Sequence, residues 1–104
     1  MDHRSRVLIV DNDPDVLCSM RAIFDAEGYA VTLAADGSSA RRVYEEHRPD
    51  AIILDIAMPV LDGWYFLAHL AGEVAPPPVI ITALKAHPLD VARAKALGAC
   101  DFFV

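Results

Sequence analysis

The chain has 104 residues, of which 55% are hydrophobic and 23% are charged. This length and composition predict a single globular domain, residues 1–104, and exclude a disordered chain or a second domain with its own core. The formal net charge of −6 argues against a surface that follows nucleic-acid phosphates, so we expect no direct contact with nucleic acid.

The N-terminal residues run directly into the apolar stretch Val7–Val10. This stretch is too short for a signal peptide or a membrane span, so we expect a cytoplasmic protein that does not contact the membrane. Cys18 and Cys100 lie in different apolar segments and lack the spacing of a redox or metal motif. We therefore expect buried free thiols in a reducing compartment.

Five short apolar runs alternate with helical patterns along the chain, which is typical of a parallel sheet covered by helices. The predicted strands are Val7–Val10, Tyr29–Leu33, Ala51–Leu54, Val79–Thr82 and Cys100–Val104. Their rhythm predicts an α/β fold: a doubly wound, flavodoxin-like parallel sheet of five strands in the order 2-1-3-4-5.

Four segments between the strands carry apolar residues at helical spacing. The first helix begins at Pro14, behind the N-cap Asp13, and ends at Gly28. The other three begin near Ser38 or Ser39, after Gly63 and after Pro88, and end at Pro49, Gly72 and Gly98. The expected core side chains of the first three helices are Val16, Leu17, Met20, Ile23, Phe24, Ala40, Val43, Tyr44, His47, Phe66, Leu67 and Leu70. The fourth has only a thin apolar stripe.

Polar side chains end three of the predicted strands. Asp11 and Asn12 follow the first strand, Asp55 follows the third, and Thr82 ends the fourth. These strands are neighbours in the expected order, so the side chains converge at the carboxyl edge of the sheet, where open α/β sheets bind ligands. Two carboxylates so close repel each other unless a proton or a cation lies between them, and oxygen ligands of this kind suit Mg²⁺. A carboxylate beside Mg²⁺ can attack phosphorus and form an aspartyl phosphate.

Four motifs in this order resemble the receiver domain of bacterial two-component response regulators. They are Val7–Pro14, Asp55–Pro59 with Leu61-Asp62-Gly63, Pro78–Ala83 and Gly98–Phe102. The resemblance covers the whole chain. It implies that Asp55 accepts a phosphoryl group from a sensor histidine kinase or phosphotransfer protein, and that Thr82 is the switch hydroxyl.

The resemblance also implies a metal site and a switch residue. Mg²⁺ would be held by Asp11, Asp55 and the backbone carbonyl of Ala57, and Asn12 stands where the family usually has a second acidic residue. Its amide oxygen remains a candidate ligand, but we expect weaker Mg²⁺ binding. Phe102 occupies the position of the family's aromatic residue whose rotamer changes when the switch hydroxyl moves.

Other features of the family fall outside the sequence. The Lys that pairs with the phosphate would come one position after Val104, and the last helix would follow it, so the chain is expected to be a receiver domain that is incomplete at its C-terminus. Ala57 and Leu84 flank the path of the attacking water and cannot orient it by side-chain hydrogen bonding, which predicts slow loss of the phosphoryl group.

Two further function classes stay open beside the phosphoacceptor switch. A degenerate receiver would serve as a phosphorylation-independent protein-interaction module, which Asn12 makes conceivable. A phosphatase with an Asp nucleophile would need a general acid two residues after Asp55, where Ala57 stands. We therefore expect that the protein is not an enzyme and catalyses only its own phosphorylation and dephosphorylation. The sequence leaves open the kinase, an output domain or partner protein, and homodimerisation.

Overall fold

The computed structural model describes residues 4–55, 62–82, 96, 98 and 101–103. Strands and helices alternate along this part of the chain. The elements are β1 (Arg6–Val10), α1 (Pro14–Ala26), β2 (Ala30–Ala34), α2 (Gly37–His47), β3 (Ala51–Asp55), α3 (Asp62–Ala71), β4 (Val79–Thr82) and β5 (Asp101–Phe103). The expected fourth helix falls on residues outside this description, apart from Ala96 and Gly98.

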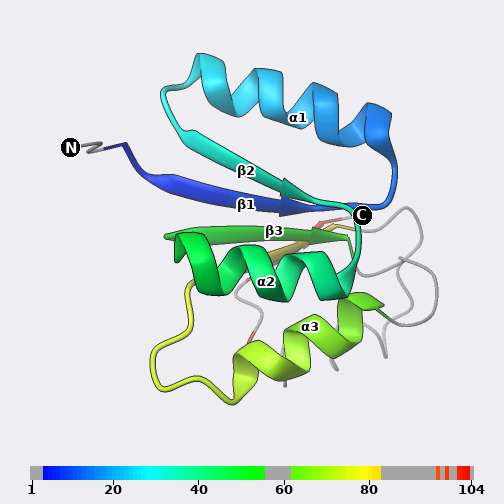
Figure 1. The fold of residues 1–104 in the computed structure, drawn as a ribbon, viewed down its shortest axis with the longest axis vertical. Coiled ribbons are helices and arrows are strands. Elements are labelled where there is room, and N and C mark those ends of the chain that lie inside the picture. Colours follow the sequence, from blue (N-terminus) through cyan, green and yellow to red (C-terminus); the bar gives the residue numbers. More distant parts are fainter. Residues whose placement is uncertain (1–3, 56–61, 83–95, 97, 99–100, 104) are drawn as a thin grey trace.

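The strands form one parallel sheet in the order β2-β1-β3-β4-β5, which confirms the predicted flavodoxin-like topology. In Figure 1, α1 lies on one face of the sheet, and α2 and α3 lie on the other. The strands run in one direction, so their carboxyl ends meet at the same edge.

Alternate residues of the strands enter two separate clusters of buried side chains, because successive side chains of a strand point to opposite faces. The larger cluster lies under α2 and α3 and includes Leu8, Val10, Ile52, Leu54, Val79, Ile81, Tyr44, Phe66, Leu67 and Leu70. The smaller cluster lies under α1 and comprises Val7, Ile9, Leu17 and Ile53, with Met20, Phe24, Val31 and Leu33 packed against it. The apolar residues of β1 and β3 are therefore buried on both faces of the sheet.

Helix α1 begins as predicted, but its apolar face is narrower than expected. Asp13 is the N-cap and Pro14 the first helical residue. Leu17 is buried, whereas Ile23 is 61% exposed and Cys18 is an exposed free thiol. Each residue advances about 100° around a helix, so Ile23 and Cys18 lie to either side of the stripe that faces the sheet. The predicted burial of both side chains was wrong.

Helix α2 differs from the prediction in its first residue and in the burial of its last one. Its N-cap is Asp36, whose Oδ1 accepts a hydrogen bond from the Ser39 backbone N–H at 2.7 Å, so the helix starts at Gly37 rather than at Ser38 or Ser39. His47 is exposed, which corrects its predicted place in the core, because the helix ends there and Arg48 turns the chain with a left-handed φ of 44°.

Candidate functional site at the carboxyl edge of the sheet

Two of the candidate side chains face each other across neighbouring strands. Asp55, the last residue of β3, is paired in register with Thr82, the last residue of β4. Asp55 comes two residues after Ile53, and Thr82 comes two residues after Ile80. Because residues two apart in a strand point to the same face, and these two strands are in register, the side chains of Asp55 and Thr82 emerge on the same face of the sheet. The structure therefore brings a carboxylate and a hydroxyl together at the end of the β3–β4 ladder.

Asp11 joins this pair from the neighbouring strand. Val10 of β1 is paired with Leu54 of β3, so Asp11 comes beside Asp55 at the carboxyl edge. The Asp11 backbone N–H donates to the Ala34 carbonyl oxygen at 3.1 Å, which continues the pairing with β2 beyond the strand itself. Asp11 is the one buried charged residue among those the structure describes, with 7% exposure.

The carboxyl group of Asp11 has a perturbed acidity. Burial raises its pKa from the ordinary value of 3.8, because water no longer solvates the negative charge. A hydrogen bond from the Asp13 backbone N–H, 2.9 Å from Asp11 Oδ1, opposes this rise. The negative charge of Asp55 and a hydrogen bond with its carboxyl group raise the pKa further. Asp11 and Asp55 are thus close enough to compete for one proton.

Such a pair fits a divalent cation. An ion between the two carboxylates would relieve the repulsion that raises the Asp11 pKa, and oxygen donors alone suit Mg²⁺. Asn12 is exposed in the bend that follows β1, directly beside Asp11. The fourth expected ligand, the Ala57 carbonyl, lies outside the described residues.

Comparison with known proteins identifies the family to which this arrangement belongs. Residues 7–104 match the family model of the response regulator receiver domain. The chain is a response regulator receiver domain.

Relatives with known names agree with this assignment. The transcriptional regulatory protein PrrA of Mycobacterium tuberculosis is 40% identical over 95% of the chain, and KdpE of the same species is 33% identical over 92%. The receiver domain spans 42% of the length of each of these relatives, so it corresponds to less than half of them.

Solved structures share the fold. The chemotaxis protein CheY4 of Vibrio cholerae is 28% identical, with a TM-score of 0.88 over 97% of this chain and 86% of that one. A CheY-like receiver domain of Methanospirillum hungatei has a TM-score of 0.90 at 25% identity, over 96% of this chain and 80% of that one.

Three residues that the sequence analysis singled out lie wholly or in part outside the described residues of this receiver domain. Phe102 is paired in register with Ile81, but its side chain is outside the description. Ala57 and Leu84, which bear on hydrolysis, are also outside it. Sequence reasoning missed the two backbone partners of Asp11, the Asp13 amide and the Ala34 carbonyl, because backbone contacts of this kind leave no side-chain pattern.

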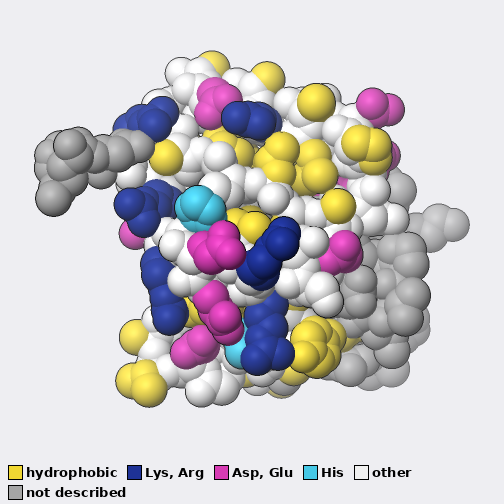
Figure 2. Space-filling view, viewed as in Figure 1, with side chains coloured by type: hydrophobic (Ala, Val, Ile, Leu, Met, Phe, Trp, Pro, Cys, Tyr) yellow, Lys and Arg dark blue, Asp and Glu magenta, His cyan; other side chains and the backbone are white. Residues whose placement is uncertain are grey.

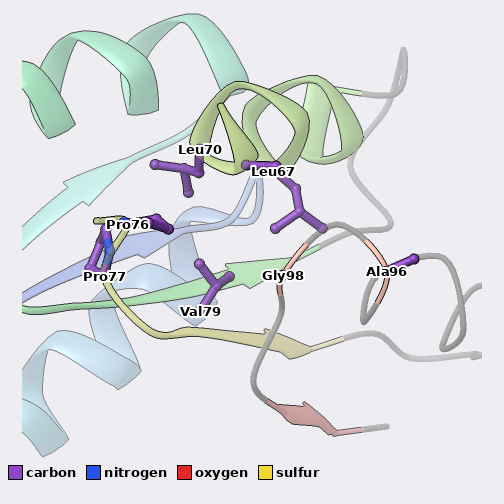
Figure 3. A pocket seen from close by; sticks show the side chains of 8 residues that line it. Leu67, Leu70, Pro76, Pro77, Val79, Ala96 and Gly98 are labelled. Atoms are coloured by element: carbon purple, nitrogen blue, oxygen red, sulfur yellow. The ribbon is translucent and has the colours of Figure 1, made fainter. Parts of the chain in front are cut away.

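The pocket seen in Figure 3 lies away from this edge of the sheet. Figure 3 shows a pocket of about 190 Å³ between the end of α3, the Pro76-Pro77 turn and the start of β4, with an apolar lining that includes Leu67 and Val79. In Figure 2, positive and negative side chains alternate on the visible face. Among the helices that the structure describes, none is long and apolar enough to cross a membrane.

Proposed function

We propose that this receiver domain is a phosphoacceptor switch that takes a phosphoryl group on Asp55 from a sensor histidine kinase or a phosphotransfer protein, with Mg²⁺ as cofactor. The observation that carries the proposal is the convergence of Asp11, Asp55 and Thr82 at one sheet edge, where Asp55 is in register with Thr82. Family membership agrees with it.

Each side chain has a defined task in this proposal. A carboxylate oxygen of Asp55 attacks phosphorus, the bond to the donor breaks, and an acyl phosphate forms. Bound Mg²⁺ supplies positive charge that offsets the charge of the phosphoryl oxygens. Asp11 and Asp55 would hold it, with Asn12 and the Ala57 carbonyl as further ligands. The Thr82 hydroxyl, one strand away, donates a hydrogen bond to a phosphoryl oxygen.

The acceptor can be tested with a small phosphodonor such as acetyl phosphate in the presence of Mg²⁺. We expect the intact protein to gain the mass of one phosphoryl group and to lose it again in hydroxylamine, which cleaves acyl phosphates. Asp55→Asn should remain unmodified, because an amide oxygen is a much weaker nucleophile than a carboxylate. Asp50→Asn is the matched control, because Asp50 precedes the same strand at its opposite end, where its carboxylate accepts a hydrogen bond from the Arg6 N–H at 2.8 Å.

The same assay separates this proposal from the alternative. Labelling that persists in Asp55→Asn would place the acceptor elsewhere. A protein that stays unmodified with donor and Mg²⁺ in excess would instead support a phosphorylation-independent interaction module, the function that Asn12 in place of an acidic residue favours. The proposal also includes an output domain or partner protein that receives the signal, a homodimer, and a cytoplasmic location.

A further inference from the structure

Asp13 makes two hydrogen bonds in the turn between β1 and α1, one through its side chain and one through its backbone. Asp13 Oδ1 accepts from the Asp15 backbone N–H at 2.9 Å, which caps the helix. The Asp13 backbone N–H donates to Asp11 Oδ1, also at 2.9 Å. One residue therefore links the start of α1 to the buried carboxylate of the candidate site.

The two hydrogen bonds depend on one backbone conformation. Asp13 is extended, with φ −94° and ψ 113°, as is expected of an N-cap residue and of a residue that precedes proline. The Asp13 carbonyl accepts from the Leu17 N–H at 3.1 Å, and the buried Leu17 side chain anchors α1 to the sheet. Without the side-chain cap, the first turn of α1 would hold Asp13 less firmly, and its N–H would be less well aimed at Asp11.

We propose that Asp13 is a positioning residue whose cap fixes the amide that orients the Asp11 carboxylate for Mg²⁺. The amide engages Asp11 Oδ1 and restricts the rotation of the carboxylate, so that the orientation does not have to be fixed when the ion binds. This inference rests on the proposed function and adds to it a residue that acts on the metal site through another residue.

Two variants that place an uncharged side chain at position 13 separate the effect of the helix cap from the effect of the charge. Asp13→Ser retains a side-chain oxygen that can cap the helix, whereas Asp13→Ala does not, and both remove the same negative charge. We expect Mg²⁺ to bind Asp13→Ser about tenfold more tightly than Asp13→Ala, at the low end of the effect of outer-shell partners. The Mg²⁺ titration can be followed by isothermal titration calorimetry.

A second control separates positioning from helix stability. Ala22→Gly weakens α1 at an exposed position remote from the cap, by an amount comparable to the loss of a cap. It should leave the Mg²⁺ affinity at the wild-type value. Equal affinities of the Ser and Ala variants would overturn the proposal, and so would an equally large loss of affinity in Ala22→Gly. A direct ligand role for the Asp13 carboxylate predicts such equality, because serine cannot replace the carboxylate at the metal.

Nuclear magnetic resonance of the metal-free protein gives a readout that does not depend on the proposed function. The amide proton of residue 13 should be shifted downfield and protected from exchange in the wild type and in Asp13→Ser, and should lose both features in Asp13→Ala. The absence of Mg²⁺ binding by the wild type would overturn the proposed metal site, whereas identical amide signals in Ser and Ala variants would overturn the role of Asp13.

Discussion

Asp11 carries a carboxyl group at a buried position, where a neutral side chain would make the fold more stable as long as no cation is bound. Burial and the neighbouring Asp55 raise its pKa, so the ionised form is disfavoured in the folded state. Functional sites often contain a group that destabilises the folded protein. At this candidate site, the charge of the Asp11 carboxylate would attract a cation.

The pH dependence of stability provides a test at this residue. The folded state binds the Asp11 proton more tightly than the unfolded chain does, because the pKa of Asp11 is raised from 3.8. Its contribution to stability is therefore retained at pH values below 3.8 and is lost as the pH rises through the folded-state value. We expect Asp11→Asn to be more stable than the wild type at neutral pH, and this advantage to shrink as the pH falls toward 3.8.

Urea unfolding in the presence of a chelator would measure the effect, with Asp15→Asn as the control for an exposed carboxyl on α1. A difference between wild type and Asp11→Asn that stays constant across the acidic range would contradict the assignment.

At this scale the sequence indicates which side chains lie at the sheet edge but not how they are held. Asp11, Asp55 and Thr82 could be placed because each is a polar residue that ends an apolar run. The degree of burial of Asp11 could not, because it depends on elements distant in sequence. The amide contact from Asp13 could not be foreseen either, since any residue but proline carries that N–H.

The elements differ in how well periodicity predicts their buried faces. The prediction holds for α3, whose Phe66, Leu67 and Leu70 are all fully or almost fully buried. It fails for part of α1, because the sheet covers only a narrow strip of the wide apolar face of this helix. An apolar residue at the margin of a helical stripe satisfies the same pattern whether or not a neighbour covers it.

A pair of truncations on these two helices should show the contrast. Phe66 is fully buried and packs edge-on against the Tyr44 ring, with 6.3 Å between the ring centroids. Phe66→Ala should therefore lower the free energy of unfolding by about 3–5 kcal/mol. Ile23→Ala should change it by no more than about 0.5 kcal/mol, because the side chain is largely exposed. Denaturant unfolding of both variants would measure the difference, and similar losses would show that Ile23 is covered in solution.

The whole molecule follows from the alternation of strands and helices. The strand order agrees with the prediction because parallel strands need crossover helices and these connections are almost always right-handed, which leaves few arrangements. The boundaries were less predictable: α2 is capped by Asp36 and begins at Gly37, not at Ser38 or Ser39, because several residues in that turn can act as caps. The unequal size of the two side-chain clusters also could not be deduced from strands that are apolar throughout.

Binding of a cation should stabilise the molecule as a unit. Mg²⁺ at ten times its dissociation constant should raise the free energy of unfolding by about 1.4 kcal/mol, because it binds the folded state alone. Circular dichroism and the fluorescence of Trp64, which is 8% exposed in the larger cluster, should agree with each other on the unfolding midpoint in each condition, and Mg²⁺ should raise that shared midpoint. Asp11→Asn should lose most of the Mg²⁺ response, and an undiminished response in that variant would place the ion elsewhere.

The register that pairs Asp55 with Thr82 also pairs Ile53 with Ile80 and Leu54 with Ile81. A slip of one residue would turn every one of these side chains to the wrong face, so the candidate site and the apolar interior are assembled or lost together. Uptake of phosphate would then be a direct report of correct strand alignment, and a library of interior variants could be sorted for native folding by chemical labelling alone.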